Sequence, residues 1–193
     1  MARSKRIPIL ALRETCIQIM DQIENNDAKF NRKSYWSFGR KGSRGVALLF
    51  LRDIGLAVLH HNRDTAGRTI AVDLNNITRI INVYAPYLYG QQAFFGRLKE
   101  QMVGPTRVIL MEDFNCAMFS EDRSSLRGAP RRLGHGYRGA QALGTLVDEL
   151  GLAECWRALQ PGRAGMTWKG QGLESRIDHV YISATLVDDL QSA

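Results

Sequence analysis

The sequence predicts an α/β fold in which two β-sheets pack face to face and helices cover their outer surfaces. Many short strand-like runs are separated by turn residues, whereas only a few segments have helical spacing. Strands and helices do not alternate one to one, which is evidence against a doubly wound parallel sheet. We find no repeat, low-complexity tract or Pro/Ser-rich linker, so residues 1–193 are expected to form a single domain.

The first half of the chain is predicted to consist mostly of strands. Ile7–Arg13 is an apolar run with the length of a buried strand, and Thr15–Asn25 has apolar side chains at helical spacing behind Thr15, a suitable N-cap. The aromatic and basic segment Arg32–Lys41 is expected to form a strand and turn on the core, in preference to a surface that stacks nucleobases. Turn residues separate four further strands: Gly45–Arg52, Leu56–His60, Thr69–Leu74 and Thr78–Tyr84.

The second half combines helices with strands. Leu88–Met102 and Arg138–Leu150 have the apolar periodicity of amphipathic helices. Thr106–Met111 is a fully apolar strand that runs into Glu-Asp-Phe-Asn, and a loop rich in arginine and glycine follows it. Met166–Lys169 and Arg176–Ser183 are predicted to be the two closing strands.

The composition is that of an ordinary globular protein with excess positive charge. The net charge is +7 and the sequence pI is near 9.6, which indicates a polyanionic partner without requiring one. No stretch approaches the roughly 20 apolar residues of a membrane-spanning helix, so no membrane association is expected. The 3 cysteines lie far apart, so we expect buried free thiols and an intracellular protein, not a disulfide framework or a zinc site.

Several acidic, amide and hydroxyl side chains lie at or near the ends of predicted strands, where distant segments can meet. Hard oxygen ligands of this kind suit magnesium, which binds to one or two carboxylates and keeps water molecules for a phosphate substrate. A carboxylate or amide beside the metal can orient an attacking water. These side chains belong to Glu14, Asn82, Tyr84, Asp113, Asn115 and Asp178.

Each of these residues also has an ordinary structural interpretation. Glu14 can be the first residue of a helix, Tyr84 can be a strand aromatic, and the segment after Asp113 can be a turn. Asp178 lies among apolar residues and needs a partner if it is buried. Because Arg176 and Asp178 are two residues apart on one strand face, a salt bridge between them is a structural alternative.

Taken together and in order, five segments resemble the endonuclease/exonuclease/phosphatase superfamily, and in particular the endonuclease domains of non-LTR retrotransposons. These segments are Leu12–Thr15, Arg44–Phe50, Ile81–Pro86, Glu112–Asn115 and Met166–Ser183. Asp122-Arg123 after the Asp-Phe-Asn motif and the Leu-Ala-Glu-Cys-Trp-Arg stretch favour the retrotransposon members. The resemblance implies a four-layer α/β sandwich and a nuclease that uses Mg²⁺, with Mn²⁺ as the alternative, and no small-molecule cofactor.

The resemblance also implies roles for the polar residues. Glu14 would be the main metal ligand, and Tyr84 would lie beside the scissile phosphate with support from Asn82. Asp113 would orient and activate the attacking water, while Asn115 would help to hold phosphate or metal. Water would attack phosphorus in line, and the 3′ oxygen would leave as a hydroxyl that could prime reverse transcription.

Four departures from the family pattern bear on activity. The family begins with an Asn-bearing strand and ends with a Ser-Asp-His segment whose histidine Asp178 would contact, and neither is found here, so we expect a fold incomplete at its terminal strands. His179 should point to the face opposite Asp178 and is no substitute. Arg13 stands where the family has Gln, and Glu112 stands where it has Gly, a residue that allows tight backbone geometry. We therefore expect a feebly active or inactive chain.

DNA is the expected partner, and the arginine-rich loop is its candidate binding surface. Arg123, Arg127, Arg131 and Arg132 could hold backbone phosphates beside the pocket, although a solvated loop is an equal alternative. The leading function is DNA nicking within a retrotransposon protein, which would place the chain in the nucleus. The alternatives are a phosphoesterase of the same fold for another phosphate ester, and a degenerate fragment that binds DNA without cutting it.

Overall fold

The computed structural model describes residues 7–17, 23–24, 27–28, 33–40, 44–104, 107–125 and 137–190. Its centre is a 6-stranded sheet with the strand order β4-β5-β6-β7-β12-β9. Only β6 and β7 pair in parallel; the other neighbours in this sheet are antiparallel. The strands are β4 (Val58–Arg63), β5 (Thr69–Leu74), β6 (Thr78–Tyr84), β7 (Arg107–Asp113), β9 (Leu152–Glu154) and β12 (Asp178–Ser183).

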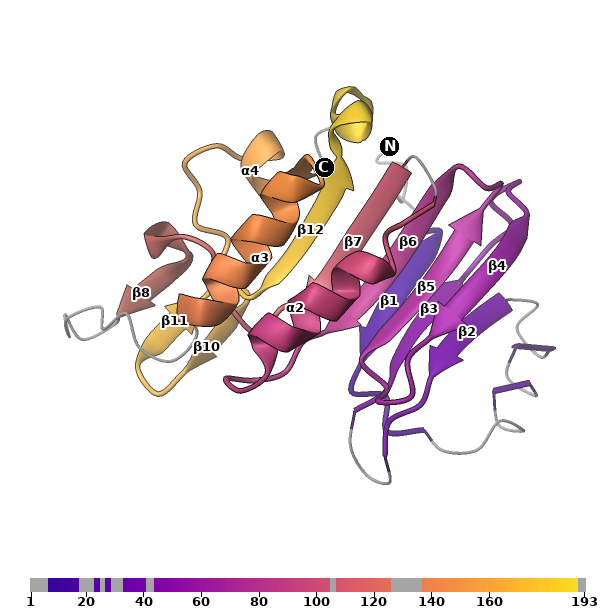
Figure 1. The fold of residues 1–193 in the computed structure, drawn as a ribbon, viewed down its shortest axis with the longest axis horizontal. Coiled ribbons are helices and arrows are strands. Elements are labelled where there is room, and N and C mark those ends of the chain that lie inside the picture. Colours follow the sequence, from indigo (N-terminus) through magenta and orange to yellow (C-terminus); the bar gives the residue numbers. More distant parts are fainter. Residues whose placement is uncertain are drawn as a thin grey trace, which may run out of the picture.

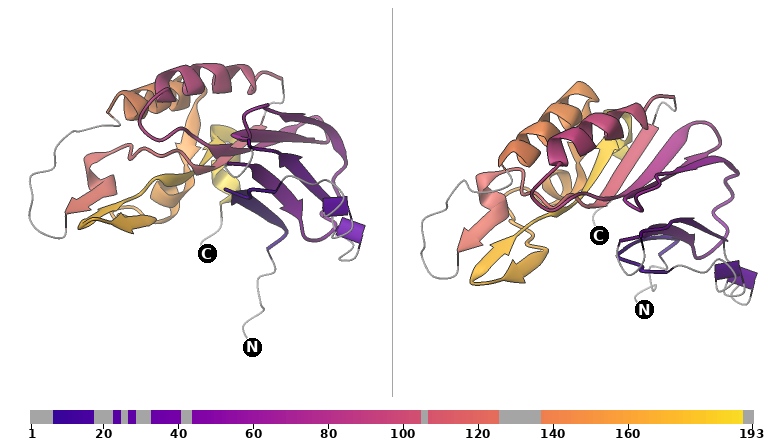
Figure 2. Two further views of the ribbon diagram at one scale, coloured as in Figure 1. Left: turned by 90° about the horizontal axis from the view of Figure 1, so that it is seen from below. Right: turned by 60° about the horizontal axis from the view of Figure 1, so that its bottom comes forward.

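A second sheet lies against one face of the first and has the strand order β1-β3-β2. It is formed by β1 (Ile9–Arg13), β2 (Lys33–Ser37) and β3 (Val46–Phe50). The two sheets bury one apolar cluster, in which residues of β3 pack against residues of β5 and β6. Figure 2 shows this small sheet lying under the β4–β7 half of the large one.

Helices α2 (Gln91–Glu100) and α3 (Tyr137–Glu149) cover the other face of the large sheet, side by side (Figure 1). Phe94, Phe95 and Leu98 of α2 and Leu143 and Leu146 of α3 are buried there in a second apolar cluster. The predicted α/β class, with packed sheets flanked by helices, is therefore confirmed.

A third, smaller sheet extends from the β12 side of the molecule, with the order β10-β11-β8. Short helical segments flank it and the end of β12. These elements are β8 (Arg123–Ser125), β10 (Trp168–Gly170), β11 (Leu173–Ser175), η1 (Ser120–Asp122), α4 (Cys155–Leu159) and η2 (Ala184–Asp189).

Two details of the sequence prediction are wrong. No helix begins at Thr15, because the Thr15 and Cys16 N–H groups donate to the carbonyl oxygens of Gly45 and Arg44 and residues 14–17 are not helical. The remainder of that predicted helix falls mostly outside the described residues. The cysteines are free, but only Cys116 is buried, and burial raises its pKa to about 12; Cys16 is exposed.

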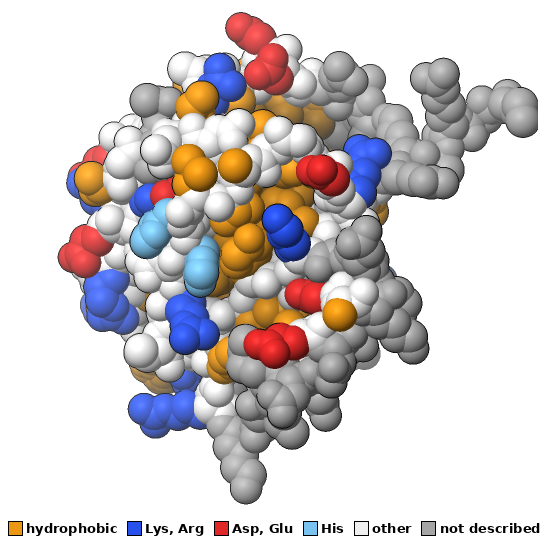
Figure 3. Space-filling model, turned by 90° about the vertical axis from the view of Figure 1, so that its right-hand side faces the viewer, with side chains coloured by type: hydrophobic (Ala, Val, Ile, Leu, Met, Phe, Trp, Pro, Cys, Tyr) orange, Lys and Arg blue, Asp and Glu red, His pale blue; other side chains and the backbone are white. Residues whose placement is uncertain are grey.

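Strand β4 forms one edge of the large sheet and is mostly exposed. Figure 3 looks onto this side of the molecule and shows hydrophobic side chains gathered in a hollow beside histidines. His60, His61 and the 55% exposed Leu59 belong to this strand. Among the helices in the described part of the chain, none is long and apolar enough to cross a membrane.

Two glycines, Gly45 and Gly67, allow the loops next to the C-terminal end of β1 to approach one another closely. Gly45 has a φ of +97°, and a Cβ there would lie 2.4 Å from Thr15 Oγ1. Gly67 has a φ of +67°, and its Cβ would lie 2.4 Å from the Gly39 nitrogen. Gly45 N–H donates to Gly67 O at 3.1 Å, so the loops form one hydrogen-bonded unit.

Gly67→Ala is expected to destabilise the fold more than Gly55→Ala does. Gly55 has nearly the same φ, +69°, but a Cβ there would meet nothing within 4 Å. The left-handed backbone should therefore cost both variants roughly 1–2 kcal/mol, and only Gly67→Ala adds a clash with backbone atoms. Urea unfolding measures both. Equal losses of unfolding free energy in the two variants would show that the close approach of Gly39 and Gly67 adds no clash to the cost of Gly67→Ala.

Candidate active site

Three neighbouring strands bring three of the predicted site residues level with one another. Tyr84, the last residue of β6, pairs with Asp113, the last residue of β7. Asp113 in turn pairs with Asp178, the first residue of β12. Asp113 is only 2% exposed, while Tyr84 and Asp178 are half-buried. The end of the sheet thus holds two carboxylates and a phenol in one row.

Glu14 reaches this row from the loop after β1, although 70 residues separate it from Tyr84. The Tyr84 hydroxyl donates a hydrogen bond to Glu14 Oε1. Burial raises the pKa of Tyr84, and the Glu14 carboxylate raises it further, so this phenol remains a hydrogen-bond donor at neutral pH. Because Glu14 is itself exposed and not helical, its interpretation as a helix-start residue is wrong.

The two asparagines hold the backbone of the site in place. Asn115 N–H donates to Asp113 Oδ1 at 2.8 Å, which is the Asx turn of the structural alternative, and its side chain donates to Ala85 O at 2.8 Å. Asn82 is fully buried, and its Nδ2 donates to Leu12 O and Ala47 O, both at 2.8 Å. Asn82 therefore ties β1 and β3 to β6 beneath the row of polar groups.

Arg13, the last residue of β1, places its guanidinium among three carboxylates. Its Nε lies 3.1 Å from Glu112 Oε2, one terminal nitrogen contacts Asp113 Oδ2, and the other lies 3.4 Å from Asp178 Oδ1. The structural alternative that Arg176 neutralises Asp178 is therefore wrong. Sequence reasoning noted Arg13 as a departure from the family pattern, but periodicity alone could not identify its partners.

Residues with unusual backbone conformations surround the site. Positive φ angles occur at Glu14 (50°), Arg44 (66°), Glu112 (94°) and Asn115 (49°). Such angles cost non-glycine residues energy and are concentrated at functional sites in many proteins. Glu112 occupies the position where the resemblance places a glycine, and its φ explains why a glycine suits that position.

The oxygen atoms in this region are of the type that a divalent cation binds. Asn82 Oδ1 is buried and accepts no hydrogen bond, whereas the buried oxygens Glu112 Oε2 and Asp178 Oδ1 have ion-pair contacts with Arg13. Within the described residues there is no group of three or more His, Cys, Asp or Glu side chains already arranged around a common point. The carboxylate and amide donors fit a hard cation that keeps several water ligands, with Glu14 as its exposed carboxylate.

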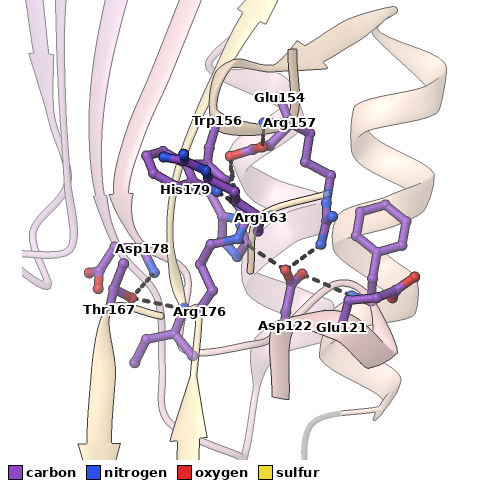
Figure 4. Close-up of polar contacts among 12 residues, drawn as sticks. Glu121, Asp122, Glu154, Trp156, Arg157, Arg163, Thr167, Arg176, Asp178 and His179 are labelled. Atoms are coloured by element: carbon purple, nitrogen blue, oxygen red, sulfur yellow. Dashed lines mark hydrogen bonds and ion pairs between the residues drawn. The ribbon is translucent and has the colours of Figure 1, made fainter. Parts of the chain in front are cut away.

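A buried ion network lies behind the site and joins three of the segments that carried the resemblance (Figure 4). Asp122 Oδ1 accepts from Arg157 at 2.5 Å and from Arg176 Nε at 3.0 Å. Arg176 also donates to Glu154 Oε1 at 2.6 Å. Asp122 is 0% and Arg176 is 2% exposed, so these charges depend on one another for solvation. The network anchors the start of β12 to η1 and α4.

His179 points away from Asp178, as the strand alternation predicts. Its side chain is buried, its Nε2 lies 3.2 Å from Cys116 O, and its ring packs edge-on against Phe114. The other ring nitrogen, Nδ1, lies 3.8 Å from Glu154 Oε1. His179 is therefore a structural residue of the core.

The predicted DNA-binding arginines are only partly described. Arg123 is the first residue of β8 and is half-buried beside the ion network. Arg127, Arg131 and Arg132 lie outside the described residues. Their role stays a prediction.

Solved structures with a similar arrangement of sheets and helices include a 3′ phosphatase and an AP endonuclease. The structure of 3′ phosphatase NExo from Neisseria bound to product DNA hairpin matches 96% of this chain and 79% of that chain, with a TM-score of 0.73 and 22% identity. The AP endonuclease from Archaeoglobus fulgidus matches 94% of this chain and 78% of its own, with a TM-score of 0.73 and 20% identity. The chain therefore has the fold of the endonuclease/exonuclease/phosphatase nucleases.

Sequence comparison adds a more specific relative. The chain is 28% identical over 162 residues to the Transposon TX1 uncharacterized 149 kDa protein of Xenopus laevis. The match includes 78% of this chain but only 12% of that protein, so the chain spans about an eighth of its relative's length. No family model matches the sequence. The likeness to a transposon protein agrees with the retrotransposon interpretation of the motifs.

Glu112→Gly is expected to be more stable than Glu112→Ala by about 1 kcal/mol. Both variants remove a carboxylate whose pKa is raised by burial, but only glycine accepts a φ of 94° without strain. Thermal unfolding should show a difference of about 2–4 °C for a chain of this length. An alanine variant as stable as the glycine variant would mean that this backbone carries no strain.

Glu154→Gln is expected to lower stability at neutral pH and to matter less in acid. Burial alone would raise the pKa of Glu154, but the His179 ring, the Arg157 N–H group and the Arg176 charge outweigh it and lower the pKa. The stabilisation is therefore present above the ordinary value of 4.5 and disappears as the pH falls below it.

Thermal unfolding from pH 7 down to about pH 3 tests this expectation. The gap between wild type and Glu154→Gln should close in acid. The control is Glu149→Gln, which removes a carboxylate 2.7 Å from Lys99 in an exposed pair and should change stability little. A constant gap would rule out the ion network as the source of the effect.

Proposed function

We propose that this chain is a divalent-metal-dependent phosphodiesterase that nicks DNA within a transposon-encoded protein. One observation carries the proposal: four polar side chains from the ends of four different strands meet at one end of the sheets. They belong to Glu14, Tyr84, Asp113 and Asp178. The nuclease fold and the similarity to a transposon protein support it. Placement in the nucleus would follow from this function and stays a prediction.

The residues divide the chemistry among them. Mg²⁺ or Mn²⁺, held through Glu14, would supply positive charge to the phosphate oxygens and to the leaving oxygen. Asp113 accepts a proton from the attacking water, whose oxygen forms the new bond to phosphorus. The bond from phosphorus to the 3′ oxygen breaks, and that oxygen takes a proton from solvent water, which leaves a 3′ hydroxyl and a 5′ phosphate at the nick. The Tyr84 hydroxyl, which donates to Glu14 in this structure, would donate to the phosphate once Glu14 holds the metal, and Asn115, whose N–H donates to Asp113 Oδ1, would position Asp113 and help to hold phosphate or metal.

One observation favours a second candidate, a protein that binds DNA without cutting it. The Arg13 guanidinium contacts Asp113 directly, so this carboxylate is engaged before any water arrives. Glu112 draws Arg13 into the same place through its own contact at 3.1 Å. If this arrangement persists with DNA bound, Asp113 cannot act as a base and the chain is a binding module.

Nicking of supercoiled plasmid in Mg²⁺ separates the two candidates. We expect slow conversion to open circles by the wild type and a loss of about 10²-fold or more in Asp113→Asn, because amide nitrogen cannot accept the water proton. Asp148→Asn changes an exposed residue of α3 and is the matched control, with an unchanged rate. Arg13→Gln releases Asp113 and should speed nicking.

The outcomes decide between the candidates. Nicking that survives in Asp113→Asn would reject the assigned site. DNA binding without any nicking, in the wild type and in Arg13→Gln and with either metal, would reject the enzyme and leave the binding module.

A further inference from the structure

A pocket of about 620 Å³ adjoins the candidate active site on the side of the loop after β1. Glu14 and Tyr84 line it, so it opens directly from the row of catalytic groups. Its other lining includes two arginines and two tyrosines from different loops: Arg44, Arg68, Tyr87 and Tyr89. These six residues define the tyrosine–arginine pocket.

The two arginines give this pocket a local excess of positive charge. Burial lowers the pKa of Arg68, and the neighbouring charge of Arg44 lowers it further, so the two guanidiniums repel each other. Arg68 donates to Tyr84 O at 2.9 Å and lies 5.4 Å from the centre of the Tyr84 ring. Asp64 attracts Arg68, but its Oδ1 already accepts the N–H groups of Arg68 and Thr69. A phosphate between the arginines would relieve the repulsion.

The backbone conformation of Arg44 is a second indication that its side chain has a function. Its φ of +66° lies in the left-handed region, which glycine adopts without cost. An arginine there costs about 1–3 kcal/mol of strain. The strain persists because Arg44 O accepts the Cys16 N–H at 3.0 Å and Gly45 N–H donates to Gly67 O. A charged side chain at a strained position beside a pocket is typical of a binding site.

The tyrosines supply aromatic surface at the mouth of the pocket. Tyr87 is 73% and Tyr89 is 83% exposed, in the short segment between β6 and α2. Leu88 between them has a φ of +63°, and Tyr89 N–H donates to Tyr87 O at 2.9 Å, so the segment turns sharply. Exposed aromatic rings beside arginines are the usual elements of sites that stack nucleobases.

We infer that the tyrosine–arginine pocket binds one unpaired nucleotide next to the cleaved phosphate, which rests on the proposed function of the adjoining site. Arg44 and Arg68 hold the phosphate of this nucleotide, and Tyr87 or Tyr89 stacks on its base. The base must be unpaired, because both faces of a base within a duplex are covered by its neighbours. The preferred substrate is therefore DNA with a single-stranded or extrahelical nucleotide at the cleavage site.

Fluorescence anisotropy in EDTA tests the pocket without any cleavage. The probes are one labelled oligonucleotide as a single strand, in a full duplex, and in a duplex that leaves one nucleotide bulged. The wild type should bind the bulged and single-stranded forms about 10-fold more tightly than the duplex, as one base stacked on an aromatic ring provides. Replacing both tyrosines with Ala should abolish the difference, and replacing both with Phe should preserve it.

Arg44→Gly tests the phosphate contact in a variant that should fold at least as well as the wild type, since it removes the strain. Affinity for the unpaired probes should fall, and the slope of log affinity against log salt should decrease by about 0.7–0.9. Arg97→Ala, on an exposed position of α2, is the control for general charge loss and should leave the preference for unpaired probes intact.

Several outcomes would overturn the inference. These are equal binding of duplex and unpaired probes, an Arg44→Gly variant with wild-type affinity and salt slope, and displacement of the probe by polyglutamate as readily as by unlabelled single strand. Because binding is measured in EDTA, the result is independent of cleavage. Preferential binding of the unpaired probes without plasmid nicking would reject only the proposed function. Plasmid nicking without such a preference would reject only the proposed role of the pocket.

Discussion

The candidate site depends on the register of three strands, β6, β7 and β12. Alternate residues of β7 face opposite layers: Val108 and Leu110 pack with the helices, whereas Ile109 and Met111 pack toward the small sheet. Asp113 continues the second series, so its carboxylate faces the end of β1 and its Arg13. A slip of one residue would turn Asp113 toward the helices and separate it from Tyr84 and Asp178. The apolar burial of the sheet therefore positions the polar groups.

This dependence explains which features could be predicted from the sequence. Strands β5 and β6 were predicted at their observed bounds because each is a buried run between turn residues. The gathering of Glu14, Tyr84, Asp113 and Asp178 was predicted through the resemblance, since no local pattern links residues so far apart. Strands β8, β9 and β11 have 3 residues each and exist only through pairing with distant segments, so periodicity could not reveal them.

Ion-pair partners were the other feature that sequence could not provide. Alternation gives the face on which a charge lies, but not the segment that packs opposite it. Arg176 was a reasonable partner for Asp178, yet it is buried against Asp122 and Glu154. The sequence stretches around Asp122 and Glu154, which favoured the retrotransposon members, therefore supply a structural ion-pair network and not the groups of the proposed reaction. A motif can be specific to a group of proteins because it stabilises their shared framework.

Arg13 and Glu112 are better understood as one coupled change than as two separate departures. A partly buried cluster of Glu112, Asp113 and Asp178 without a cation would be unfavourable, because the three negative charges repel one another. Arg13 supplies that cation from within the chain. Conversely, without Glu112 the Arg13 guanidinium would lose one of its three carboxylate partners and its positive charge would act mainly on Asp113. A divalent ion that enters this region must compete with a tethered guanidinium.

The loops beside the site extend this coupling to the pocket. Cys16 N–H donates to Arg44 O, and Thr15 N–H donates to Gly45 O, so the segment that carries Glu14 is hydrogen-bonded to the segment that carries Arg44. Both segments contain residues held at positive φ by these contacts. A phosphate bound by Arg44, as proposed, would therefore act on the backbone next to Glu14. Because the strained positions belong to one hydrogen-bonded unit, the proposed binding of a nucleotide in the pocket and the proposed binding of a metal at Glu14 would depend on the same local conformation.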